Sequence, residues 1–283
     1  MKPSRSSVTA GMVSAARGVG VSAEWRDPVA HAFASERLAR RVARFERHTP
    51  GVELARFVVR ALSLGLVDHN TLRMLLVDRA LLAWRELGVR QVVLLGAGLD
   101  SRSWRLAELG DCDVFEVDHP DTQAVKRQRV AALTRSARSV AFVPVDFERD
   151  DLVRALGAAG HRSGEPTGWV CEGVSAYLPP AVTAQLLRQV GECSAPGSHL
   201  ALSYVTPLAG RGAFSKALAA LLVHHLGESA RGFISRDAVC ELLGAAGLTV
   251  LEDTGWPEWQ QRFAGYRALP NAFKERLVIA RKG

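Results

Sequence analysis

The sequence predicts an α/β protein with a doubly wound, seven-stranded and mostly parallel sheet. Short apolar segments recur along residues 91–281, and several of them end in a glycine or a carboxylate. Stretches with helical spacing of apolar residues separate them, which is typical of parallel strands joined by crossover helices. The first apolar segment, 91–95, leads directly into Gly96-Ala97-Gly98. In open sheets of this class, the turn after such a strand is where nucleotides bind.

The composition indicates a soluble globular protein, since 48% of the 283 residues are hydrophobic and 23% are charged. No apolar run approaches the roughly 18 residues of a membrane span, so no membrane partner is expected. The four cysteines are far apart and form no Cys-x-x-Cys pair. This pattern favours free thiols in a reducing cytoplasm over disulfides or a metal site. We therefore expect a cytoplasmic protein without a bound metal.

The net charge of +7 is concentrated at the N-terminus, where residues 1–50 contain nine Lys or Arg and four Asp or Glu. A basic face can meet phosphates or an anionic substrate. More often it is simply solvated, and no surface aromatic residues are interleaved with these charges to stack on bases. We expect no nucleic-acid partner.

Residues 1–88 are predicted to form a helical N-terminal cover. Within it, 1–22 show no clear period and are interpreted as a mobile segment or a flap. Apolar residues at helical spacing then predict three helices, at about 29–45, 52–64 and 70–87. Asn70 is expected to cap the last of them.

The remainder is expected to alternate strand and helix. The predicted strands are 91–95, 112–117, 140–145, 168–172, 199–205, 248–253 and 275–281. The predicted helices between them are 103–109, 120–134, 149–159, 180–194 and 236–246. We interpret the chain as one domain, with a cofactor-binding core at 89–205, a lid insertion at 206–234 and a C-terminal helix and strands at 235–283.

Gly96 and Gly98 allow a sharp turn after the first strand and a close approach of a ligand to the backbone. An ordinary strand-to-helix turn would have the same pattern. The second strand, however, leads into Asp118, 22 residues after Gly96. That spacing is where a carboxylate takes the ribose hydroxyls of a nucleotide, although Asp118 could also cap the next helix. The two signals together favour a nucleotide site.

Two further strands lead into acidic residues. Asp146 and Phe147 follow the third strand, and these types suit hydrogen bonding and stacking of a purine, while a helix cap is an alternative for Asp146. The fourth strand ends at Glu172, followed by Gly173. The carboxyl ends of parallel strands meet at one edge of the sheet, so we expect these carboxylates to lie together.

The loop after the first strand separates two kinds of cofactor. A nicotinamide fingerprint has a third glycine where this chain has Ser101. Asp100 would repel a pyrophosphate but could accept from an ammonium group. The loop therefore favours S-adenosylmethionine, which has an amino acid moiety and no phosphate, over NAD.

Four segments resemble, in order and spacing, the motifs of the leucine carboxyl methyltransferase family. These segments are Leu94–Leu106, Glu116–Pro120 with Lys126 and Arg127, Val145–Phe147 and Glu172–Pro180. Arg26–Ala30 and Arg73–Asp78 are similar to its N-terminal elements. The resemblance spans residues 70–205 and implies a class I methyltransferase sheet with an antiparallel last strand.

The resemblance also implies roles for single residues. Arg73 would pair with the methionine carboxylate, and the Gly96-Ala97-Gly98 backbone would carry the methionine end. Asp118, next to His119, would hold the ribose, and Asp146 with Phe147 the adenine side. Glu172 and Gly173 would line the cofactor near its methionine portion. From the residues alone, Arg73 would be interpreted as a surface arginine of a helix.

The methyl acceptor is less determined. A carboxylate is ionised at neutral pH and needs no base, whereas a phenol or alcohol requires one. His224 and His225 in the insertion are candidates for this base, although exposed lid histidines are the commoner arrangement, and Tyr177 is a candidate to touch the acceptor. Two adjacent residues of a helix do not face one site, so at most one histidine serves.

We therefore expect an O-methyltransferase acting on a small natural-product acid such as a polyketide, as a monomer or a homodimer. The alternatives are a protein or peptide C-terminal carboxyl methyltransferase, a cofactor-binding scaffold without transferase activity, an interaction protein that uses its basic N-terminal face, and an NAD-dependent dehydrogenase.

Overall fold

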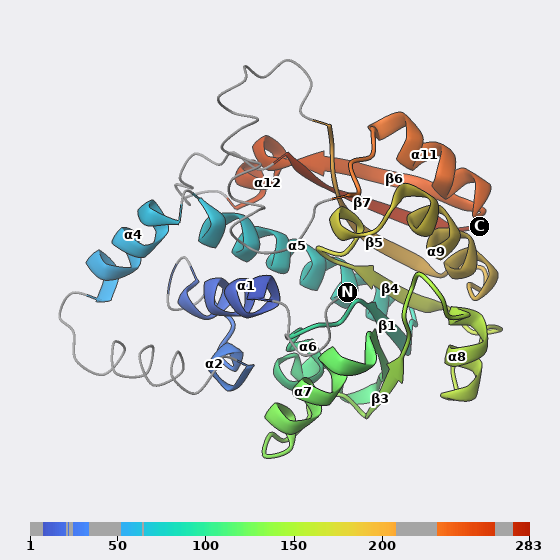
Figure 1. The fold of residues 1–283 in the computed structure, drawn as a ribbon, viewed down its shortest axis with the longest axis horizontal. Coiled ribbons are helices and arrows are strands. Elements are labelled where there is room, and N and C mark those ends of the chain that lie inside the picture. Colours follow the sequence, from blue (N-terminus) through green and yellow to red (C-terminus); the bar gives the residue numbers. More distant parts are fainter. Residues whose placement is uncertain are drawn as a thin grey trace.

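The protein is organised around a seven-stranded sheet with the order β3-β2-β1-β4-β5-β7-β6 (Figure 1). The computed structural model describes residues 8–20, 22, 25–33, 52–63, 65–207, 231–263 and 274–283. The strands are β1 (Gln91–Leu95), β2 (Asp113–Asp118), β3 (Ser139–Pro144), β4 (Thr167–Cys171), β5 (His199–Val205), β6 (Leu248–Gly255) and β7 (Glu275–Lys282). Strands β1 to β5 are parallel, and β7 runs antiparallel to both of its neighbours. The predicted fold class is confirmed.

The chain order reverses between β1 and β4, which are neighbours in the sheet although two strands separate them in sequence. This is a topological switch point, where the loops after two strands diverge and leave room for a ligand. The loop that begins at Gly96 follows β1, and Glu172 follows β4. The predicted cofactor residues therefore meet at the switch point.

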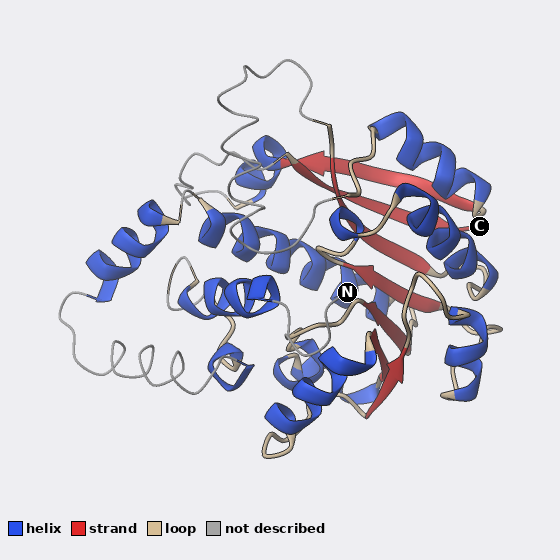
Figure 2. Ribbon diagram, viewed as in Figure 1, coloured by secondary structure: helices blue, strands red, loops and turns tan. Residues whose placement is uncertain are grey.

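Both faces of the sheet are covered by helices, which explains the continuous apolar runs of the strands (Figure 2). Val93 and Leu95 of β1 point into the larger core, and Val92 and Leu94 point into the core on the opposite face. The larger core is closed by α8 (Leu152–Ala158), α9 (Pro180–Glu192) and α11 (Arg236–Ala245). The opposite face carries α5 (Leu66–Glu86), α6 (Arg102–Arg105), α7 (Pro120–Val130) and α12 (Trp256–Arg262).

The N-terminal cover differs from the prediction in two places. Residues 8–19 form a helix, α1 (Val8–Val19), which packs on α5. Its buried face includes Ser14 and Ala16, small residues that allow close packing but give no apolar period. Asn70 is not a cap, because α5 begins at Leu66 after Gly65, whose φ of 82° stops the preceding turn. Asn70 lies inside the helix and is almost completely buried.

The other helices of the cover are α2 (Ala30–Phe33) and α4 (Val52–Leu62). In Figure 1, α1 and α2 lie on the side of the molecule toward which the carboxyl ends of the parallel strands point. Two short 3-10 helices, Ala107–Asp111 and Ser175–Tyr177, follow β1 and β4. Most of the predicted 206–234 insertion lies outside the described residues. No described helix combines the length and apolar character needed to cross a membrane.

Candidate active site

The glycine loop after β1 is held against the loop after β4. Gly96 and Gly98 both have positive φ angles, of 62° and 44°, which L side chains rarely adopt. A Cβ on Gly96 would lie 2.3 Å from Cγ2 of Val174. Glycine is thus required at position 96 both for its backbone conformation and for the contact between the two loops.

Asp118 fixes the other side of this loop. Its Oδ2 accepts from the backbone N–H of Gly98 at 2.5 Å, and its Oδ1 accepts from that of His119 at 2.6 Å. Each oxygen keeps a second lone pair for a ligand. His119, not Asp118, caps α7, because its ring accepts from the N–H of Asp121 at 3.3 Å. The helix-cap alternative for Asp118 is not what the structure shows.

Arg102, the first residue of α6, is the centre of a buried ion network and has no exposed surface. Its Nε donates to Asp78 at 2.7 Å and its Nη2 to Glu172 at 2.7 Å. Its Nη1 contacts Asp100, which also accepts from the Arg102 backbone N–H at 2.8 Å. Arg105 contacts the same Asp78 at 2.7 Å. Asp100 and Glu172, predicted from separate motifs, therefore meet on one arginine.

Arg73 lies in this network and is not on the surface. Its Nε donates to Glu172 at 3.0 Å, its Nη2 to Asn70 at 3.0 Å, and its Nη1 contacts Glu275. Glu275 also lies 2.5 Å from Nε2 of His69. A Cβ on Gly173 would be 3.5 Å from Nη2 of Arg73, so the β4 loop runs directly beside this guanidinium.

Arginines favour the ionised state of two carboxylates in the network, Glu172 and Asp100. Burial alone would raise the pKa of Glu172, but Arg102 and Arg73 lower it well below its usual range. Asp100 is also buried, yet Arg102, and after it Arg17, lowers its pKa. Asp118 has no such partner, and burial raises its pKa despite the two backbone hydrogen bonds.

The predicted adenine residues lie after β3. Oδ1 of Asp146 accepts from the backbone N–H of Glu148 at 3.0 Å, and its own N–H donates to Asp150 at 2.8 Å. Asp146 therefore closes the turn before α8. Phe147 is partly buried against the larger core. Their role at the adenine stays a prediction.

Of the predicted catalytic residues, Tyr177 is 37% exposed at the end of the 3-10 helix after β4. His224 and His225 lie outside the described residues. Within the described part of the chain, no group of three or more His, Cys, Asp or Glu side chains could hold a metal ion.

Sequence reasoning missed the partners that complete the network. They are Asp78, Arg102, Arg105, Glu275, His69 and Asn70. Arg102 follows directly on Asp100 and Ser101, but the sequence pattern indicates no role for it. Glu275 opens β7, whose antiparallel direction places this residue beside Val205, at the carboxyl end of β5.

Comparison with known proteins identifies this architecture. The model of the leucine carboxyl methyltransferase family matches residues 9–191. The chain belongs to the leucine carboxyl methyltransferase family. This confirms the resemblance seen in the four motifs.

Two curated relatives illustrate the similarity. One, from Mycolicibacterium gilvum (strain PYR-GCK), is 40% identical over 163 residues, 57% of this chain and 53% of the relative. Another, from Parafrankia sp. (strain EAN1pec), is 44% identical over 132 residues, 47% of this chain and 43% of the relative. Both are provisionally named S-adenosyl-L-methionine-dependent methyltransferases. The chain spans about half the length or less of the curated relatives it matches.

Solved structures share the fold. A DUF574 family protein from Streptomyces avermitilis MA-4680 gives a TM-score of 0.59 at 19% identity, over 84% of this chain and 92% of that one. A protein from Thermobifida fusca YX, provisionally described as a methyltransferase, gives 0.57 at 18% identity, over 96% and 94%.

The site of this leucine carboxyl methyltransferase family member fits S-adenosylmethionine in the chemistry of its side chains. The cofactor has a ribose diol, a cationic sulfonium and an amino acid, and the switch point presents Asp118, several ionised carboxylates and arginines. One buried polar atom near the glycine loop, Nε of Arg17, has no hydrogen-bond partner. Unpartnered buried donors of this kind are expected where a ligand completes a site.

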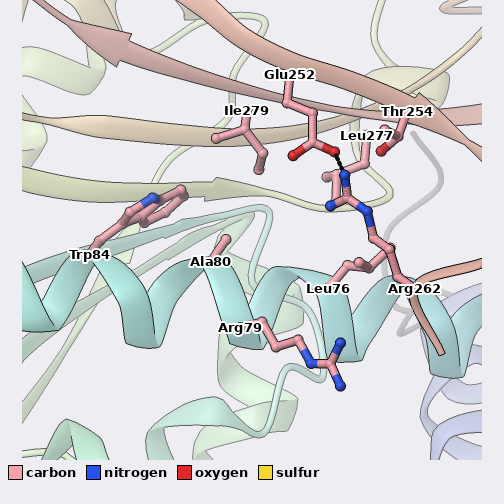
Figure 3. A pocket seen from close by; sticks show the side chains of 9 residues that line it. All are labelled: Leu76, Arg79, Ala80, Trp84, Glu252, Thr254, Arg262, Leu277 and Ile279. Carbon is pink, nitrogen blue, oxygen red and sulfur yellow. Dashed lines mark hydrogen bonds and ion pairs between the residues drawn. The ribbon is translucent and has the colours of Figure 1, made fainter. Parts of the chain in front are cut away.

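A separate pocket of about 290 Å³ lies between α5 and strands β6 and β7. Figure 3 shows Leu76, Ala80 and Trp84 of α5 facing the strands, and Arg262 pointing to Glu252, with which it forms an ion pair. None of the described residues predicted for the cofactor lines this pocket.

Proposed function

We propose that the chain is an S-adenosylmethionine-dependent O-methyltransferase that acts on the carboxylate of a small natural-product-type acid. The observation that carries this proposal is the convergence of the glycine loop, Asp118 and Glu172 at the switch point of the sheet. The family, and the names of the relatives, support the cofactor.

The bound cofactor would supply an electrophilic methyl group on a sulfonium. The residues of this chain have to bind it, orient it and exclude water, because an in-line displacement depends mainly on orientation. Asp118 would accept from the ribose hydroxyls. The glycine loop would approach the methionine portion, and the carboxylates Asp100 and Glu172 would favour its positive charges.

A carboxylate acceptor is supported by the low basicity of two carboxylates at the site. Glu172 and Asp100 have pKa values held low by arginines, so they are poor bases at neutral pH. Asp118, whose pKa is raised, is engaged by two backbone N–H groups. An acceptor that is already ionised needs no base. His224, His225 and Tyr177 remain candidates if the acceptor is a phenol.

The protein is proposed to act in the cytoplasm on a small-molecule acceptor and to bind neither nucleic acid nor a membrane. It would act as a monomer or a homodimer. A peptide C-terminal carboxylate is the alternative substrate of the same chemistry.

The proposal is tested in two stages. Calorimetric titration with S-adenosylmethionine, S-adenosylhomocysteine and NAD should show binding of the first two and none of NAD. Acids, phenols and carboxyl-terminal peptides are then offered with labelled cofactor. Base-labile label on an acid supports the proposal, whereas base-stable label on a phenol would move it to ether formation. Binding of none of the three nucleotides would contradict it.

A further inference from the structure

The pocket between α5 and strands β6 and β7 is bounded by one apolar face of the helix and one of β7. On α5, Leu76, Ala80 and Trp84 follow one another at four-residue spacing, so they lie on the same side of the helix. On β7, Leu277 and Ile279 are two residues apart and share a face of the sheet. The helical part of this lining extends over about 12 Å, at 1.5 Å per residue. The pocket is therefore an elongated apolar slot.

The slot is left open by a small side chain in the middle of the helix face. Ala80 lies between Leu76 and Trp84, which are buried at 6% and 4% exposure (Figure 3). These two larger residues pack against the sheet, and alanine is too short to fill the space between them. The resulting volume of about 290 Å³ is near the lower end of the range for ligand pockets, about 300–1,000 Å³. Replacing water in such an apolar slot by an apolar group is favourable.

The charged residues that line the pocket carry a net positive charge. Arg262 of α12 forms an ion pair with Glu252 of β6, and their side chains are 42% and 33% exposed. The guanidinium of Arg79 packs over the ring of Phe263, 4.2 Å from its centroid. Among the residues that the structure describes, no Asp or Glu lies within ion-pair distance of Arg79. One positive charge is thus left without a carboxylate partner.

The remaining polar group of the lining is already engaged. Oγ1 of Thr254 accepts from Nε1 of Trp259 at 3.1 Å, and Thr254 is 8% exposed. The arginines are therefore the main donors that a ligand could use. A guanidinium binds a carboxylate with two parallel hydrogen bonds. One unmatched positive charge suits such a monoanion better than a phosphate dianion.

We propose that this pocket binds a small carboxylic acid with an elongated apolar body, at a site separate from the cofactor site. The apolar body lies between Ala80 and Ile279. The carboxylate lies at the end of α12, where Arg79 and Arg262 line the pocket. This inference goes beyond the proposed function and does not depend on it, because it concerns binding and no reaction.

The sequence supplies a reporter and an internal control for the test. It contains two isoleucines, Ile234 and Ile279. Ile279 lines the pocket, whereas Ile234 lies in the larger core on the opposite face of the sheet. The protein is labelled with carbon-13 at the isoleucine δ1 methyl groups, and Ile234→Val assigns the two signals. Titration with 2-naphthoate should shift the Ile279 signal, because the ring current acts on a neighbouring methyl group, and leave that of Ile234 in place.

The charge is tested with a neutral ligand and two variants. Methyl 2-naphthoate has the same rings without the anion and should bind at least about five-fold more weakly than the acid. Arg79→Met should weaken 2-naphthoate by about two- to five-fold and leave the ester unchanged. Glu252→Gln should strengthen 2-naphthoate by a similar factor, because it removes a negative charge and frees Arg262.

The shape of the pocket is tested with a matched pair of substitutions on α5. Ala80→Phe fills the slot and should abolish the shift of Ile279 with both ligands. Ala83→Phe places the same ring at an exposed position of the helix and should leave binding as in the wild type. Circular dichroism and thermal melting show whether each variant folds. If Ala80→Phe does not fold, Ala80→Leu takes its place with Ala83→Leu as its control.

Three results would overturn the inference. The first is a wild type in which 2-naphthoate leaves the Ile279 signal unchanged or shifts that of Ile234 alone, which would place the acid elsewhere. The second is equal affinity for the acid and its methyl ester, which would remove the role of the arginines. The third is a folded Ala80→Phe variant that binds 2-naphthoate as well as Ala83→Phe does. None of these results bears on binding of S-adenosylhomocysteine, so the proposed function stands or falls separately.

Discussion

Asp100 and Glu172, in the loops after β1 and β4, accept from arginine side chains. Asp118, the last residue of β2, and Asp146, after β3, accept instead from backbone N–H groups. The two halves of the site thus stabilise their carboxylates differently. The arginine-paired half has lowered pKa values for Asp100 and Glu172, and burial raises that of Asp118. Charge is matched at one end, and acceptor oxygens are presented at the other. This division suits a ligand with an amino acid at one end and a ribose at the other.

The largest effect is expected from breaking the paired half at its centre. Arg102→Met leaves Asp78, Asp100 and Glu172 buried with too little positive charge. Removing one partner of a buried ion pair costs about 3–5 kcal/mol of unfolding free energy. Urea unfolding followed by circular dichroism measures it. The control is Arg138→Met, which removes an exposed pair with Asp113 and should cost less than about 1 kcal/mol. Equal losses of unfolding free energy in the two variants would show that the buried network contributes no more to stability than an exposed ion pair.

At acid pH, Glu275, which is paired with Arg73, and Asp118 contribute to the free energy of unfolding with opposite signs. Despite burial, Arg73 lowers the pKa of Glu275 from 4.5 to about 2. A carboxyl whose pKa is lower in the folded state stabilises it above its unfolded value, and that stabilisation is lost as the pH falls through the folded value. Asp118, whose pKa is raised, contributes with the opposite sign.

We therefore expect the free energy of unfolding to fall as the pH drops from about 4.5 toward 2, by roughly 3 kcal/mol from Glu275 at most. Glu275→Gln should flatten this dependence in urea titrations across that range. Asp118→Asn should steepen it, because an opposing contribution is removed. A slope unchanged by Glu275→Gln would contradict the pairing with Arg73.

Which parts of the site could be predicted from the sequence depends on how far apart in the chain the contacting residues are. The strands, the glycine loop and three carboxylates could be predicted, because each is a local pattern of apolar runs and their ends. The pairs Arg73–Glu275 and Arg102–Asp78 join residues 202 and 24 positions apart, and no local pattern encodes them. Arg73 was interpreted as a surface residue from its own segment alone.

Local sequence patterns also failed to predict the helix α1 and the position of Asn70. The buried face of α1 uses Ser14 and Ala16, whose small size gives no hydrophobic period. Asn70 has the side chain of a helix cap, yet it donates to the carbonyl of Leu66 within α5 and accepts from Arg73. Its amide is therefore satisfied by the Leu66 carbonyl and by Arg73, and not by capping backbone N–H groups.

The backbone-bonded half is tested through ligand affinity. Asp118→Ala removes the acceptor predicted for the ribose and should weaken S-adenosylhomocysteine by about 1–3 kcal/mol. Its unfolding free energy should fall by less than that of Arg102→Met, because burial of this carboxylate is not offset by an arginine. Calorimetry and urea unfolding give the two numbers. Unchanged affinity would contradict the ribose assignment.

Asp146 should give the smallest effect. Its Oδ1 closes a turn at the surface by accepting from Glu148, so Asp146→Ala should cost about 1 kcal/mol of stability, as for a lost cap. Asp146→Asn keeps an acceptor oxygen for the Glu148 N–H and should retain the stability of the wild type. Because Asp146 is only half-buried, a bond from the adenine amine would replace one from water, and affinity for S-adenosylhomocysteine should change less than in Asp118→Ala. If both Asp146 variants lost as much affinity as Asp118→Ala, the negative charge of Asp146 would be shown to bind the adenine amine. The two ends of the site would then differ less than their contacts indicate.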